Sequence, residues 1–188
     1  MPLPESSLSR VCRAVAGFVA ERLDAQRRNV RVEIGSPAEA APGESDTDHR
    51  VNLFFYRVEP SGFGPSPGPD ETWRLRLRCL VTAFGVREEQ VAAGENDLRL
   101  LGEVLAAFHE RPVLDPLSLP EGEVRARVVF QPLATEEINQ LWATQGDTAY
   151  RPSVAYEVSL VPVPAGRPRP EAPEVESVDL QVRAGAGA

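Results

Sequence analysis

Residues 73–85 read WRLRLRCLVTAFG, the clearest strand signal in the chain. Apolar side chains occupy every second position, which predicts one strand face buried in a core; they are Trp73, Leu75, Leu77, Cys79, Val81 and Ala83. The opposite face begins with three basic side chains, here called the arginine ladder: Arg74, Arg76 and Arg78. This face becomes apolar at Leu80 and Phe84.

Other periodic segments lie on both sides of this strand. Alternating or β-rich runs predict strands at 30–34, 49–59 and 123–131, and a last strand from Val154 to Leu160. Helical spacing predicts a helix from about Leu8 that Ser6 or Ser7 caps, one from about Asn96 to Pro112, and a short one capped by Thr135. The order predicts an α+β fold: a mixed, largely antiparallel sheet of about five strands, with two to three helices on one face.

Two segments rich in Pro, Gly and Ser, residues 36–48 and 60–72, predict long exposed loops. We expect one domain over residues 1–163, followed by a Pro/Gly/Ala-rich tail over 164–188 that is mobile or bound to a partner. Within the tail, Val178, Leu180 and Val182 alternate with polar residues, which suggests a segment that adds a strand to a neighbouring sheet.

Composition excludes several classes of protein. The length of 188 residues suits one domain with its own core. The net charge of −8 argues against a general nucleic-acid binder. No apolar run is long enough to span a membrane, and the first ten residues do not resemble a secretory signal. The two cysteines, Cys12 and Cys79, fall on apolar faces and are expected to be buried.

The sequence offers little catalytic chemistry. It has two histidines, no G-x-S-x-G and no phosphate-binding loop motif, so we expect no enzyme and no cofactor. An alternative is a small-ligand or metal-binding module that uses DTDH, residues 46–49, together with His109. A hydrolase that uses Cys79 or Ser153 is the weakest alternative, because no motif places a histidine beside either residue.

The arginine ladder has two interpretations. Arg31, Arg125 and Arg127 lie on the polar faces of other predicted strands, so neighbouring strands would make one end of the sheet basic. These arginines could pair across strands with Glu33, Glu123 and Glu157. They could instead form a docking face for an acidic partner, where charge sets register and association rate.

Four strings in order resemble one family: VNLFFYRVEP (51–60), LRLRCLVTAFG (75–85), LLGEVLAAFHERPVL (100–114) and INQLWATQGDTAYRPSVAYEVSLVPV (138–163). The most specific series is Leu141, Trp142, Tyr150, Arg151, Ser153 and Tyr156. Together they are similar to the N-terminal domain of the cap, or tail-terminator, proteins of extracellular contractile injection systems, which are phage-tail-like particles. The resemblance covers about residues 6–163.

The resemblance implies a structural role and a fold similar to phage tail terminators. Such a cap is a homohexameric ring at the end of the particle distal to the baseplate. It contacts the inner tube protein and the sheath protein and stops their polymerisation. We therefore expect neither nucleic acid nor membrane as a partner, and a location in the bacterial cytoplasm within an assembled particle that is later released or retained.

The resemblance also gives candidate interface residues. We expect the arginine ladder, Arg125, Arg127, Tyr150 and Arg151 to contact tube, sheath or a neighbouring copy, since Tyr and Arg are favoured at binding hot spots. The two long loops are candidate arms toward neighbours. The alternative for Tyr150 is that it covers Trp142, and for Arg151 that it pairs with a local acid.

Overall fold

The computed structural model describes residues 3–24, 29–43, 47–62, 68, 71–119 and 122–165. In chain order, its elements are α1 (Ser7–Asp24), β1 (Val30–Ile34), α2 (Pro37–Ala40), β2 (His49–Pro60), β3 (Trp73–Phe84), α3 (Ala93–Glu110), β4 (Leu117–Leu119), β5 (Gly122–Val124), β6 (Arg127–Phe130), α4 (Thr135–Ala143) and β7 (Ser153–Val163). No helix among these described residues has the length and apolar character needed to cross a membrane.

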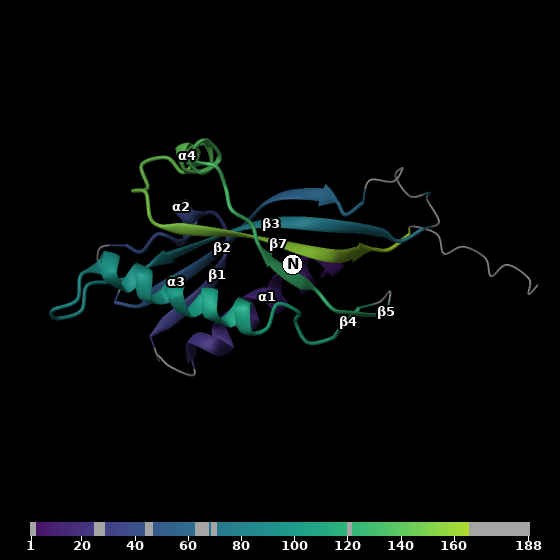
Figure 1. Ribbon diagram of the computed structural model, residues 1–188, viewed down its shortest axis with the longest axis horizontal. Coiled ribbons are helices and arrows are strands. Elements are labelled where there is room, and N and C mark those ends of the chain that lie inside the picture. Colours follow the sequence, from purple (N-terminus) through teal and green to yellow (C-terminus); the bar gives the residue numbers. More distant parts are fainter. Residues whose placement is uncertain are drawn as a thin grey trace, which may run out of the picture.

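Five strands form the main sheet, in the order β1-β2-β3-β7-β6. Strands β1 and β2 are parallel, and every other neighbouring pair is antiparallel. Helices α1 and α3 lie against one face of the sheet, and α4 lies on the other side (Figure 1). The expected α+β class and the largely antiparallel five-stranded sheet are confirmed, whereas the expectation that the helices share one face is wrong for α4.

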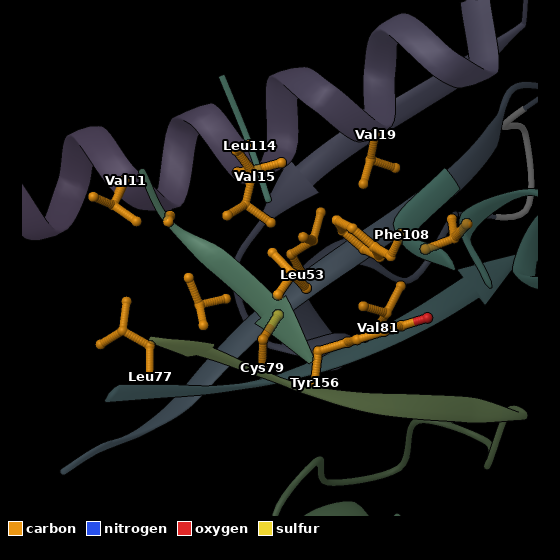
Figure 2. Close-up of a cluster of buried hydrophobic side chains, with 14 of the residues drawn as sticks. Val11, Val15, Val19, Leu53, Leu77, Cys79, Val81, Phe108, Leu114 and Tyr156 are labelled. Atoms are coloured by element: carbon orange, nitrogen blue, oxygen red, sulfur yellow. The ribbon is translucent and has the colours of Figure 1, made fainter. Parts of the chain in front are cut away.

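Helix α1 follows directly from its sequence. The Ser6 hydroxyl accepts a hydrogen bond from the Ser9 backbone N–H at 3.1 Å, which caps the first turn as expected. Apolar residues four apart then form one buried stripe, made of Val11, Val15, Val19 and Leu23. Figure 2 shows Val11, Val15 and Val19 of this stripe facing the buried β3 side chains Leu77, Cys79 and Val81. Burial of each such side chain contributes about 1.5–3 kcal/mol relative to exposure.

The segment 36–48, expected to be an exposed loop, instead contains the short helix α2. The Ser36 side chain accepts from the Glu39 N–H, and the Glu39 carboxylate accepts from the Ser36 N–H at 2.8 Å. These hydrogen bonds hold the pKa of Glu39 below its usual value. Pro37 and Ala40 are buried, so α2 packs on the sheet. This reciprocal capping stabilises one helical turn within a Pro-rich stretch.

Residues 123–131, expected to form one strand, are divided between β5 and β6. The Ala126 carbonyl accepts from the Leu114 N–H at 2.9 Å, so the backbone between the two strands pairs with the segment after α3. Strand β5 folds back on β4, while β6 pairs with β7. At α4 the N-cap is Ala134, not Thr135, and the Glu137 carboxylate accepts from the Ala134 N–H at 3.1 Å.

Gly85 leaves no room for a side chain between β3 and α3. A Cβ atom there would lie 2.6 Å from the Ala93 carbonyl oxygen and 2.6 Å from the Asn96 Cβ. We expect Gly85→Ala to lower the free energy of unfolding by about 2–3 kcal/mol through overpacking. The matched control is Gly102→Ala on the exposed side of α3, where nothing lies within 4 Å. It should raise stability by about 0.5–1 kcal/mol in urea unfolding. Equal effects would contradict the steric account.

Candidate functional site

The arginine ladder lies on the sheet face opposite α1 and α3, because it alternates with the buried side chains of β3. An irregularity in β2 between Phe55 and Arg57 changes its register against β3 and places Arg57 opposite Arg78. Arg78 is the centre of the cluster. Its Nε donates to Glu59 Oε2 at 3.0 Å, and its Nη1 lies 3.3 Å from Glu157 Oε2.

Two further arginines on this charged surface, Arg76 and Arg57, also form ion pairs. Arg76 Nε donates to the Pro60 carbonyl at 3.2 Å, and its Nη1 lies 3.7 Å from Glu157. Arg57 Nη2 pairs with Glu59 at 2.9 Å. The hydrogen bond from Arg78 holds the pKa of Glu59 below its usual value, so this carboxylate stays charged at neutral pH.

Arg74 differs from the other ladder residues. It is exposed, and within the described part of the chain it forms no ion pair. The strands β2, β3 and β7 therefore present four arginines on this surface, at 57, 74, 76 and 78, against two glutamates, Glu59 and Glu157. Cross-strand pairing with Glu157 is confirmed, yet positive charge is left over on this face. The pairs are partly exposed and contribute only a few tenths to about 1 kcal/mol each.

The other predicted arginines lie elsewhere. Arg31 pairs with Asp48 at 2.6 Å on the edge strand β1, not with Glu33. Arg127 belongs to β6 at the opposite edge, and Arg125 is exposed in the link before it. Strand β7 lies between β3 and β6. The expectation of one continuous basic face is therefore wrong for these three residues.

Tyr150 and Arg151 lie in the segment just before β7, apart from the arginines described above. The Tyr150 ring packs against the buried Trp142 ring with centroids 5.2 Å apart, and Tyr150 as a residue is still 56% exposed. Arg151 Nη1 donates to Asp97 Oδ2 at 2.9 Å. Both local contacts that the sequence left open as alternatives are thus present. A role for either residue at an interface stays a prediction.

A buried polar cluster beneath Arg151 was not foreseen from the sequence. The Asp97 carboxylate, 1% exposed, also accepts from the Gly85 N–H at 2.5 Å. Asn96 donates to the Val86 carbonyl at 2.8 Å. The cluster fixes the connection from β3 to α3. The available sequence signal was the adjacent pair Asn96-Asp97 on the otherwise apolar side of a helix.

The metal and nucleophile alternatives gain no support from the geometry. Both His49 nitrogens face protein groups: Nδ1 accepts from the Val86 N–H at 3.0 Å, and Nε2 lies 3.3 Å from Glu88. Asp46 lies outside the described residues, and within those residues no three His, Cys, Asp or Glu side chains could hold a metal ion. The Ser153 hydroxyl contacts Thr82 at 2.9 Å and the Arg151 carbonyl, not a histidine.

Cys79 is buried in the core as expected, whereas Cys12 is only partly buried, so the expectation of burial is confirmed for Cys79 alone. Burial raises the pKa of Cys12 to about 11 and that of Cys79 well above its usual value. Since the thiolate is the reactive form, we expect a thiol reagent at pH 8 to modify Cys79 only slowly in the native protein. Modification should become fast in denaturing urea. Fast modification of native Cys79 would contradict its place in the core.

The chain is similar to known proteins both in sequence and in fold. Residues 10–177 match the family model of the Pvc16 N-terminal domain. The fold is similar to a sheath/tube terminator of an extracellular contractile injection system, PVC, in its extended state, with TM-score 0.61 and 17% identity over 98% of this chain and 66% of that chain. It is also similar to the anti-feeding prophage cap, a tube-terminating cap, with TM-score 0.54 and 16% identity over 89% of this chain and 60% of that chain.

These relatives are longer than the present sequence. The chain spans less than two thirds of the length of each of the two solved structures. No curated protein matches it. At these identities the likeness to the solved structures establishes a shared fold.

Proposed function

The chain belongs to the Pvc16 N-terminal domain family, and from this membership we propose that it is a structural cap of a contractile injection system. Its place is the baseplate-distal end of the particle, where it ends the polymerisation of inner tube and sheath. The family match over residues 10–177 carries this proposal. The two solved structures that share the fold support it, since both are described as terminators.

The charged face of β2, β3 and β7 suits such a role. A cap must present fixed groups to a partner, and the ion pairs with Glu59 and Glu157 hold Arg76 and Arg78 in place. Arg74 keeps its guanidinium available to an acidic side chain on the partner. Because the whole chain carries a net charge of −8, a local excess of arginine would orient it during docking.

Tyr150 is a second candidate contact. Its ring packs against Trp142 while the residue remains more than half exposed, as an aromatic anchor at an interface does. Arg151 is a positioning residue in this proposal, because its guanidinium is held by Asp97. In the proposed homohexameric ring these residues contact a neighbouring copy, the inner tube protein or the sheath protein.

The proposed cap acts by binding and needs no catalytic group. It assembles in the bacterial cytoplasm, where tube and sheath polymerise, and stays with the particle when that particle is released or retained.

Electron microscopy of particles from cells with and without the chain tests the proposal. We expect cells that lack it to make tails of uncontrolled length, or tubes and sheaths without a closed end. Expression of the intact chain from a plasmid should restore uniform, closed tails. Particles of normal length with closed ends in its absence would contradict the proposed role.

A further inference from the structure

An apolar groove of about 650 Å³ runs between the C-terminal half of α3 and the edge strand β6. Leu105, Phe108 and His109 of α3 form one side. Val128 and Phe130 of β6 form the other, with Tyr156 of β7 at its floor. Phe130 is 52% exposed and the neighbouring Val129 is 41% exposed. So much apolar surface beside a sheet edge favours a further chain segment over water.

The backbone of β6 offers a place for a strand. Within the described residues β6 pairs with β7, and on its outer side it meets only one bridge, from Val113 to Arg127. The Val128 N–H donates outward to the Pro112 carbonyl at 2.8 Å. Backbone groups in antiparallel sheets alternate in direction, so the Phe130 N–H points to the same outer side, beyond the bridge and toward the groove.

We propose that residues 177–183 of the same chain, SVDLQVR, add a strand to the outer edge of β6 and fill this groove. These residues lie outside those that the structure describes. Their alternation would turn Val178, Leu180 and Val182 toward the groove, and Asp179 and Gln181 toward solvent. The backbone of β6 beyond the Val113–Arg127 bridge would form main-chain hydrogen bonds with the added strand. The three apolar side chains would contact the apolar walls of the groove.

Charge supports the same pairing. Residues 171–176, just before the proposed strand, contain three acidic side chains and no basic one: Glu171, Glu174 and Glu176. Arg127 and His109 line the groove. Arg127 is exposed and, among the described residues, forms no ion pair, so an acidic segment that approaches β6 would meet an available guanidinium.

The length of the connection favours the chain's own tail over that of another copy. Strand β7 ends at Val163, and the path back along it to Tyr156 is about 23 Å. The connecting residues 164–176 include several prolines, and the chain from Val163 to Ser177 reaches about 43 Å when extended. Because the tail reaches its own groove without strain, its effective concentration there is of millimolar order and exceeds that of a second copy.

Hydrogen exchange of the β6 amides in the full chain tests the inference. We expect Val178→Asp/Leu180→Asp to speed exchange of the Phe130 amide about tenfold or more and to lower Tm by about 2–4 °C. The matched control, Asp179→Ser/Gln181→Ser, changes the solvent-facing side of the same segment and should leave both unchanged. Equal exchange in the intact chain and the double Asp variant would overturn the proposal.

Mixing distinguishes the source of the strand. A ¹⁵N-labelled chain truncated after Pro170 is combined with an excess of unlabelled intact chain, and exchange is followed on the labelled molecule. We expect its Phe130 amide to stay as fast as in the truncated chain alone. Protection gained on mixing would mean that a second copy supplies the strand, and would overturn the assignment to the same chain. Neither outcome depends on the cap role, which particle imaging tests separately.

Discussion

Asp97→Ala is expected to lower the free energy of unfolding by about 3–5 kcal/mol, since it removes the buried carboxylate of a partly buried ion pair. Asp97 is 1% exposed and accepts from both the Gly85 N–H and Arg151 Nη1. Alanine would leave a buried N–H without an acceptor and a half-buried guanidinium without its counter-charge. Urea denaturation followed by tryptophan fluorescence and circular dichroism measures the change.

Glu95→Ala is the matched control for this prediction. Glu95 lies two residues earlier, in the first turn of the same helix, but its pair with Arg99 is solvent-exposed. Such exposed i,i+4 pairs contribute about 0.3–0.5 kcal/mol. If the Asp97 and Glu95 variants lost similar stability, the buried cluster would not be what fixes the β3–α3 connection.

Reversing the charge of the arginine ladder should have the largest effect on assembly. We expect Arg74→Glu/Arg76→Glu to weaken binding to uncapped tails by roughly 100-fold, because juxtaposed like charges at an interface cost several kcal/mol. Stability should change by no more than about 1 kcal/mol, since these side chains are partly exposed. Co-sedimentation with particles from cells that lack the chain measures binding.

The control for this variant carries the same change in net charge. Arg87→Glu/Arg99→Glu alters two exposed arginines around α3, away from the charged sheet face. Its binding should stay close to that of the unmodified chain, and salt should weaken binding of the unmodified chain. Equal loss in both double variants would mean that net charge, and not this face, governs docking.

The sequence predicted β3 well because a strand with one buried face has a strict period of two. From Leu75 to Ala83 the expected side chains are all buried, and the ladder alternates with them; Trp73, which was expected on the same buried face, is 39% exposed at the start of the strand. The capping of α1 by Ser6 was predicted for a similar reason, because it involves residues close together in the chain. Features that depend only on near neighbours in the chain can be predicted from the sequence without the tertiary structure.

The order of the strands in the sheet could not be predicted from such local patterns. Arg127 alternates correctly within β6, but β7 separates it from the ladder. The Glu59 partner of Arg78 depends on the irregularity in β2 between Phe55 and Arg57, which nothing in the local pattern marks. The buried side of α3 likewise includes Asp97, whose partners Gly85 and Arg151 lie 12 and 54 residues away. Such contacts are set by the sheet topology.

Helix capping explains another difference between the sequence-based expectation and the structure. The Pro- and Ser-rich composition of residues 36–48 favoured a loop, but Ser36 and Glu39 form a local helical turn there. Gln145 Oε1 then accepts from the Ala38 N–H at 3.3 Å and ties α2 to the end of α4. These segments lie over the half of the sheet where Leu80 and Phe84 are buried. The apolar second half of the ladder face was the signal that something must cover it.

The most direct test of the cap role is a cryo-EM reconstruction of the baseplate-distal end of intact particles. We expect a closed ring there whose subunits fit this domain, with the face bearing Arg74, Arg76 and Arg78 against an acidic surface of tube, sheath or a neighbouring copy. A distal end closed by a different chain, with this domain absent or elsewhere in the particle, would contradict the proposal.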